Sequence, residues 1–192
     1  MRELGCIARL QVQVEPLKRG EKPHRVYDSS LIREVDELTV TEHGVLGHVD
    51  GEDEPILDAH HRDHPHSRFR GDNGISLGVL GHYSRLRERF GDHVVDGVAG
   101  ENVLLDHPGR LTLEDLDGGV RVLSEEPVVL APVVVAEPCV EFSRLVLGDS
   151  SATASLREPL QELRGGMRGF YLGVRLGHGA RLRVGDAVMC LR

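Results

Sequence analysis

Hydrophobic and polar residues alternate over many short segments of this 192-residue chain, and this period of two predicts β-strands. Other segments are short, unbroken apolar runs rich in valine and leucine, which favour buried strands. The predicted strands are residues 7–14, 35–40, 103–105, 120–123, 128–135, 170–176 and 184–191. Because 23 glycines and 9 prolines supply turns between them, we predict a mainly β fold, a barrel or a closed sandwich.

Helical spacing of apolar residues is confined to a few places. The clearest is residues 75–90, with Asp72 or Asn73 as the cap that begins the helix. Shorter helices are predicted for residues 139–147, after a proline, and for residues 155–163, which open on a capping-box pattern. The fold class is therefore mainly β with a few inserted short helices.

Composition narrows the class of protein. Hydrophobic residues make up 40% of the chain, which is enough for the core of one domain over residues 1–192. The net charge of −8 argues against a nucleic-acid partner, and no apolar stretch approaches the roughly 20 residues that cross a membrane. The three cysteines are widely spaced, which argues against a disulfide framework and favours a reducing, cytoplasmic setting.

Cys139 is the residue best suited to reactive chemistry. It follows a valine-rich strand and stands directly after Pro138, a residue suited to the first position of a helix. We expect Cys139 in the first helical turn, where free N–H groups and the helix dipole favour the thiolate. A thiolate attacks sulfur and binds soft metals. The alternative is a buried structural thiol.

Residues 58–68 form the most polar segment and contain four histidines and two arginines. Imidazoles at this spacing are able to bind zinc or another divalent ion, although Pro65 interrupts helical geometry and no cysteine or HExxH motif accompanies them. Two alternatives remain open. The segment is a solvated loop, or it is an anion-binding rim in which His61, His64 and Arg68 hold a phosphate.

Two further segments place polar side chains beside glycines, which allow close backbone approach. Glu101 and Asn102 follow Gly100 at a predicted strand entrance, where turn capping is the alternative interpretation. Arg168 lies among glycines before the strand at 170–176, so an anion is able to approach it; a surface turn is the alternative here.

These segments occur in one order that resembles the MOSC domain, named after the C-terminal domain of molybdenum-cofactor sulfurases. The motifs are Gly100-Glu101-Asn102, Glu137-Pro138-Cys139, Arg168-Gly169-Phe170-Tyr171 and Gly185-Asp186-Ala187-Val188. The resemblance covers about residues 70–192. Residues 14–18 match the opening of stand-alone MOSC proteins more loosely. It implies a MOSC-type β-barrel, with residues 1–69 forming an N-terminal strand and a His-rich loop packed on it.

The resemblance also implies roles for residues. The cysteine that matches Cys139 either ligates the molybdenum of a bound molybdopterin-type cofactor or carries sulfur as a persulfide. Some relatives reduce N-hydroxylated compounds with electrons from a partner redox protein. Residues expected to contact such a cofactor are Glu101, Asn102, Arg168 and Tyr171, with His61, His64 and Arg68 gripping its phosphate.

The sequence departs from the family pattern in one motif and leaves three functions open. Many relatives carry His-Gly-Gly before the helix, where this chain reads His64-Pro65-His66. The only lysines, Lys18 and Lys22, match no pyridoxal phosphate site. The first function is a molybdenum-cofactor oxidoreductase with an electron-donor protein. The second is a sulfur carrier supplied by a cysteine desulfurase. The third is a non-catalytic module that binds an anionic small molecule.

Overall fold

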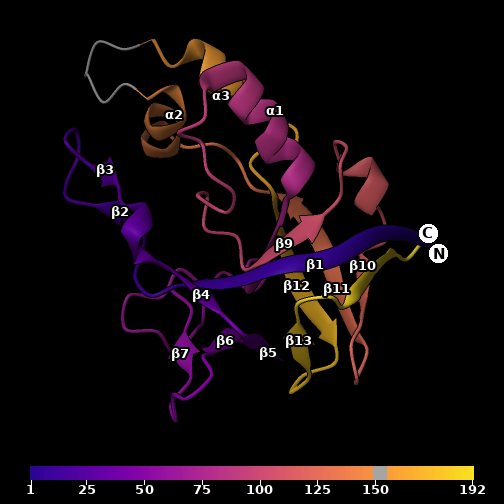
Figure 1. Ribbon diagram of the computed structural model, residues 1–192. Helices are drawn as coiled ribbons and strands as arrows, with labels where there is room; N and C mark the ends of the chain where they lie inside the picture. Colours follow the sequence, from indigo (N-terminus) through magenta and orange to yellow (C-terminus); the bar gives the residue numbers. More distant parts are fainter. Residues whose placement is uncertain (149–154) are drawn as a thin grey trace.

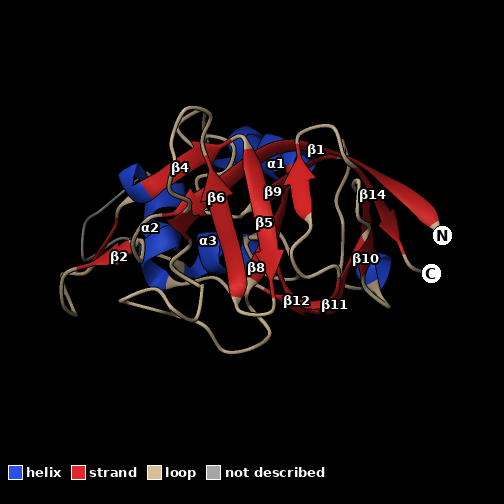
Figure 2. Ribbon diagram, turned by 90° about the horizontal axis from the view of Figure 1, so that it is seen from below, coloured by secondary structure: helices blue, strands red, loops and turns tan. Residues whose placement is uncertain are grey.

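The computed structural model describes residues 1–148 and 155–192 and contains a closed barrel of seven strands (Figures 1 and 2). Around the barrel the strands pair in the order β1, β14, β10, β11, β12, β8, β9 and back to β1. Their bounds are β1 (Arg2–Gln13), β8 (Ile75–Val79), β9 (Val103–Asp106), β10 (Val120–Leu123), β11 (Val128–Val135), β12 (Phe170–Leu176) and β14 (Ala187–Cys190). The mainly β barrel that the sequence predicts is thus confirmed.

The long strand β1 closes the barrel because it changes partners along its length. Its start pairs with β14, its middle with β9 and its end with β4 (Ile32–Val35). Gly5 lies at the irregularity in the β14 pairing, with a φ of 138°. A Cβ there would lie 2.1 Å from the carbonyl oxygen of Asp106, so the backbone approach requires glycine.

Smaller sheets flank the barrel. One has the strand order β13 (Arg181–Arg183), β5 (Glu37–Thr41), β6 (Gly44–His48) and β7 (Ile56–Leu57). Its apolar residues Leu38, Val40 and Leu182 are buried in the same core as the barrel interior. The other is the hairpin of β2 (Lys18–Arg19) and β3 (Val26–Tyr27). Single 3₁₀ turns lie at Ser29–Leu31 and Glu114–Leu116.

Three helices pack together at one side of the barrel, where Figure 1 shows α1 (Leu80–Phe90), α2 (Val140–Leu147) and α3 (Arg157–Glu162) as neighbours. A second apolar cluster joins them, to which α1 contributes Tyr83 and Leu86 and α2 contributes Phe142 and Val146. Phe142 is fully buried. This cluster fixes the start of α2, and therefore Cys139, against the end of the barrel. None of the described helices is long and apolar enough to cross a membrane.

Several predicted elements are wrong in extent. Residues 75–79 form strand β8 rather than the first turns of a helix, because all five are buried and the strand pairs with β9 on one side and β12 on the other. The predicted capping box does not form, since α3 begins at Arg157 without a side-chain cap. The strand predicted at 184–191 is shorter, since Val184 is exposed in the turn between β13 and β14.

Buried His82 on α1 makes the stability of the fold depend on pH. Its Nε2 accepts a hydrogen bond from the Leu111 N–H, and burial lowers the pKa of His82 to about 4. The folded pKa lies below the usual unfolded value of about 6.5. The contribution of neutral His82 to the free energy of unfolding is therefore complete above about pH 6.5 and is lost as the pH falls toward 4. The size of the shift corresponds to about 3 kcal/mol.

We predict that His82→Gln loses less free energy of unfolding on acidification than the wild type does. Glutamine keeps an acceptor for the Leu111 N–H but cannot ionise. Urea unfolding at pH 7.5 and pH 4.5 measures the difference, which we expect to approach about 2 kcal/mol. The same acid dependence in both proteins would contradict the prediction.

Candidate functional site

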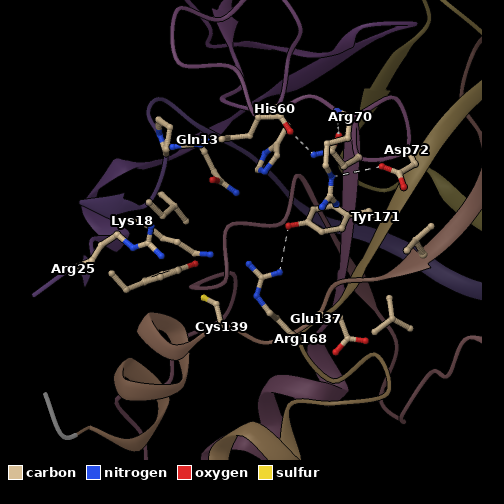
Figure 3. A pocket seen from close by; sticks show the side chains of 17 residues that line it. Gln13, Lys18, Arg25, His60, Arg70, Asp72, Glu137, Cys139, Arg168 and Tyr171 are labelled. Atoms are coloured by element: carbon tan, nitrogen blue, oxygen red, sulfur yellow. Dashed lines mark hydrogen bonds and ion pairs between the residues drawn. The ribbon is translucent and has the colours of Figure 1, made fainter. Parts of the chain in front are cut away.

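A cavity of about 660 Å³ opens where the start of α2, the end of β11, the β2–β3 hairpin and the loop before β8 meet (Figure 3). It is lined by the thiol of Cys139, by basic side chains from four segments and by two aromatic rings. The lining residues with polar or reactive side chains include Gln13, Lys18, Arg25, Tyr27, His60, Arg68, Arg70, Asp72, Glu137, Cys139, Arg168 and Tyr171.

Cys139 is the N-cap residue of α2, one position before the first turn in which the sequence placed it. Its backbone is extended, and its carbonyl accepts the Ser143 N–H at 2.9 Å. Its side chain makes no capping hydrogen bond and is half-buried at the cavity wall. The thiol is therefore held by the start of the helix and by the apolar cluster beneath it, with its sulfur facing the cavity (Figure 3).

The cavity is electropositive although the chain is acidic. Five basic side chains line it against two acidic ones, Asp72 and Glu137, whereas the whole chain carries a net charge of −8. Converging cations in a concave site favour a negatively charged ligand, and arginine suits phosphate or carboxylate in particular. The arrangement is that of an anion site beside a thiol.

Arg168 is the basic residue held most firmly. Its guanidinium packs 5.6 Å from the ring centre of Phe142, and its Nη1 lies 3.4 Å from the hydroxyl oxygen of Tyr171. The Nε is buried and has no hydrogen-bond partner among the described residues. The hydroxyl of Tyr27, whose ring packs on Phe142 at 5.2 Å, is likewise buried and unpartnered there. Two buried donors at this cavity thus have no acceptor among the described residues.

Tyr171 connects the basic wall to the His-rich loop. Its ring centre lies 5.8 Å from that of His60, and the Arg70 guanidinium carbon lies 5.6 Å from the same ring. Of the residues that the sequence singled out, the cavity brings together Cys139, Arg168, Tyr171 and Arg68.

Glu101 and Asn102 lie behind this cavity rather than on its main wall. Both carboxylate oxygens of Glu101 accept the Tyr83 hydroxyl, at 2.8 and 2.7 Å, and burial raises the pKa of Glu101. With Arg168 and Tyr171, Glu101 lines a second, much smaller pocket. Asn102 is buried and joins three segments: its side-chain amide donates to Gln11 and Asp58, and its oxygen accepts from Ser76.

His61 and His64 are directed away from the cavity. The Nδ1 of His61 accepts the Asp63 N–H, and its Nε2 lies 3.4 Å from the Thr41 hydroxyl. The Nδ1 of His64 accepts the His66 N–H, and its Nε2 donates to the Val14 carbonyl at 3.1 Å. Residues 58–68 thus do not converge on one point.

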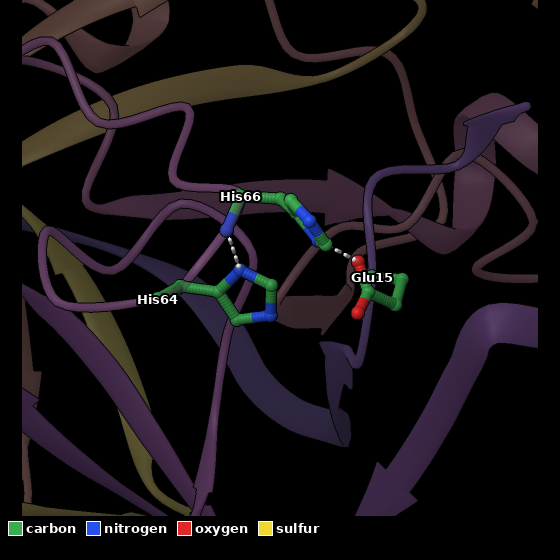
Figure 4. Close-up of side chains that lie close together, drawn as sticks. All are labelled: Glu15, His64 and His66. Atoms are coloured by element: carbon green, nitrogen blue, oxygen red, sulfur yellow. Dashed lines mark hydrogen bonds and ion pairs between the residues drawn. The ribbon is translucent and has the colours of Figure 1, made fainter.

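One possible metal cluster remains in that segment, formed by Glu15, His64 and His66 (Figure 4). Both ring nitrogens of His64 are already used in backbone hydrogen bonds, and His66 pairs with Glu15 at 2.8 Å. Metal binding there would break these bonds, so the arrangement is better explained as a link between the loop and the end of β1.

The site residues that sequence reasoning missed include the basic side chains of Lys18, Arg25 and Arg70 and the imidazole of His60. Lys18 and Arg25 lie in a turn-rich segment without periodicity. They reach the cavity because the β2–β3 hairpin folds over α2, where Arg25 pairs with Glu141 at 2.7 Å. Burial, the largest influence, raises the pKa of Glu141, but hydrogen bonds from its own backbone N–H and from Arg25 together lower it. For His60, the Asp58-Ala59-His60 spacing is a local pattern that places a carboxylate near the imidazole.

Comparison with known proteins identifies solved structures that share this fold. No family model matches the sequence, and no curated protein matches it. Solved structures do. YuaD from Bacillus subtilis has a TM-score of 0.59 at 13% identity, over 98% of this chain and 94% of its own. YiiM from Escherichia coli has a TM-score of 0.52 at 14% identity, over 100% and 70%. A hypothetical protein has a TM-score of 0.55 at 14% identity, over 100% and 69%.

The barrel of this chain therefore has a fold like those of YuaD and YiiM. At these identities the likeness concerns the fold alone, and the chemistry of the site has to be argued from the residues of this chain. Within the barrel, the thiol and the cationic wall lie where α2 meets the ends of β11 and β12.

Proposed function

We propose that this protein binds a molybdopterin-type molybdenum cofactor through Cys139 and reduces N-hydroxylated compounds with electrons from an external redox protein. The observation that carries the proposal is the convergence of one thiol and five basic side chains on a single cavity of a MOSC-like barrel. The proposal sets the reaction in the cytoplasm, where thiols remain reduced.

The residues fit such a group in size and in chemistry. A cavity of about 660 Å³ falls in the range of roughly 300–1,000 Å³ that small-molecule sites occupy. A thiolate is a suitable soft ligand for a transition metal. The unpartnered Nε of Arg168 and hydroxyl of Tyr27 are donors that a phosphate or pterin oxygen would satisfy.

When bound, the cofactor supplies two-electron redox chemistry that no side chain provides. The protein's part is binding and orientation. Cys139 would hold the metal, while Arg168 and the exposed Arg68 and Arg70 would neutralise the phosphate. Lys18 and Arg25, on the hairpin across from Tyr171, are placed to attract a substrate that carries negative charge (Figure 3).

The test is a reductase assay on protein purified from a host that makes the cofactor. Benzamidoxime serves as the N-hydroxylated probe, with a chemically reduced redox protein as the electron donor, and the amidine product is quantified. We expect turnover that depends on both molybdenum and the donor. Molybdenum-loaded protein that reduces neither this probe nor an N-hydroxylated purine would overturn the proposed activity.

Sulfur carriage is a second candidate because the Cys139 side chain forms no capping hydrogen bond and lines the cavity. The Cys139 thiolate would attack the outer sulfur of the desulfurase persulfide, releasing the desulfurase thiolate, and would pass the sulfur on from the Cys139 persulfide so formed. Incubation with a desulfurase and cysteine, followed by intact-mass measurement, separates the candidates. A sulfur-sized adduct absent from Cys139→Ser, on protein without molybdenum, would favour sulfur carriage.

A further inference from the structure

His60 and Asp58 form a hydrogen-bonded pair at the edge of the cavity. The Asp58 side chain is fully buried, and its Oδ1 lies 3.1 Å from Nδ1 of His60 and accepts the His60 backbone N–H at 2.8 Å. Its Oδ2 accepts the Gln13 N–H at 2.8 Å and the Asn102 amide at 2.9 Å. All these partners are donors, so the carboxylate is an ionised acceptor fixed on four sides.

This environment keeps Asp58 charged in spite of its burial. Desolvation is the largest influence and raises the pKa of Asp58, but hydrogen bonds from His60 and Gln13 together outweigh it and lower the pKa below its usual value. A charged carboxylate at Nδ1 requires the proton of the neutral imidazole to reside on Nδ1. The Nε2 of His60 is then the nitrogen free to take or give a proton.

The free nitrogen belongs to a ring that lines the cavity. Figure 3 shows His60 and Cys139 entering the cavity from different sides, with Tyr171 and Arg168 along a third side. No described hydrogen bond involves His60 Nε2, whereas the ring nitrogens of His64 are both engaged. Among the histidines of residues 58–68, His60 alone lines the cavity.

We propose that His60 is the acid that donates a proton during reduction of the N–O bond, and that Asp58 is its positioning residue. This inference rests on the proposed function. Two electrons from the external redox protein break the N–O bond of the substrate. One proton from His60 Nε2 goes to the departing oxygen, which leaves as water with the hydrogen it already carried. A second proton, from solvent, goes to the nitrogen, and solvent then reprotonates His60.

The pairing resembles the way a carboxylate fixes the tautomer of a catalytic histidine in other enzymes. Other charged or titratable groups share the His60 surroundings and contribute to any pH profile. They are Arg68, Arg70 and Asp72 from the same loop, Lys18 and Arg25 from the hairpin, Tyr27, Glu137, Cys139, Arg168 and Tyr171.

The test compares His60→Ala and His60→Gln with the wild type, all loaded with molybdenum cofactor. We expect unchanged molybdenum content, a fall in kcat of about 100-fold or more, and a pH profile of kcat that differs from that of the wild type. Imidazole added to His60→Ala should restore activity at least about tenfold, because the deleted ring leaves room in the cavity. A merely structural residue would not give this rescue.

His66→Ala is the matched control. His66 belongs to the same loop but is exposed and pairs with Glu15, so its loss should leave kcat and molybdenum content unchanged. A second readout needs no cofactor: long-range ¹H–¹⁵N NMR of the metal-free protein should show the neutral His60 ring protonated on Nδ1.

The outcomes separate the two proposals. If the wild type is active and His60→Ala keeps full activity, the proposed role of His60 and Asp58 is overturned and the proposed function is not. Loss of activity that imidazole does not restore, or a His60 ring protonated on Nε2, also overturns it. A molybdenum-loaded wild type without reductase activity overturns the proposed function, and with it the acid role of His60, whereas the NMR result then still reports whether the Asp58–His60 pairing exists.

Discussion

Cys139→Ser is expected to abolish reductase activity, lowering kcat by at least about 1,000-fold, while the protein stays folded. Serine is a hard, un-ionised ligand near neutral pH, so it cannot replace a soft thiolate at a transition metal. The fold should tolerate the change because serine is a preferred N-cap residue and Cys139 holds that position of α2 without a capping hydrogen bond. The assay pairs kcat with urea unfolding of each protein.

Cys6→Ser is the control for this variant. Cys6 is also a half-buried free thiol, but it lies in β1, paired with Asp106 and Ala187 and outside the cavity lining. We expect its kcat to match that of the wild type. Equal activity of Cys139→Ser and the wild type would remove the thiol from both the cofactor and the sulfur-carrier proposals.

Asn102→Asp should be the most damaging isosteric change behind the cavity. The Asn102 amide donates to Asp58 at 2.9 Å and to the Gln11 carbonyl, so aspartate would replace a donor with a carboxylate facing a buried carboxylate. We expect a loss of about 4 kcal/mol in the free energy of unfolding at pH 7, since an uncompensated buried charge is added.

Asn102→Ala serves as the comparison. It removes the same hydrogen bonds without adding charge, and we expect it to cost about 2 kcal/mol with little dependence on pH. The aspartate variant should recover stability as the pH falls toward 4, when one proton is shared between the two carboxyl groups. Urea unfolding from pH 4.5 to 8 measures this, and parallel pH curves for the two variants would show that charge repulsion is not the cause.

Local patterns in the sequence predict most strands of the barrel. Leu10 and Val12 alternate along β1 and are buried in the core, and a register shift between Ile7 and Arg9 brings Ile7 into the same core. Residues 75–79 were misjudged because Ile75 and Val79 continue the helical spacing of Tyr83, and this spacing does not show where the helix begins. The neighbours that decide the matter, β9 and β12, come from distant parts of the chain.

The site also contains both residues that local motifs predict and residues that only contacts between distant segments bring together. Cys139, Arg168 and Tyr171 belong to local motifs and meet at the cavity. Lys18 and Arg25 line it only because the hairpin folds onto α2, a contact between residues over a hundred positions apart. His60 could not be separated from His61 and His64 by spacing, since only the hydrogen bonds of the folded loop decide which ring faces the cavity.

The central claim is that Cys139 and the basic wall hold a molybdenum cofactor. The most direct measurement is the molybdenum content, by inductively coupled plasma mass spectrometry, of wild-type and Cys139→Ser protein from a molybdate-supplied host that makes the cofactor. The account predicts near-stoichiometric molybdenum in the wild type and its loss from the variant. Molybdenum absent from both proteins, or retained equally by both, would contradict it.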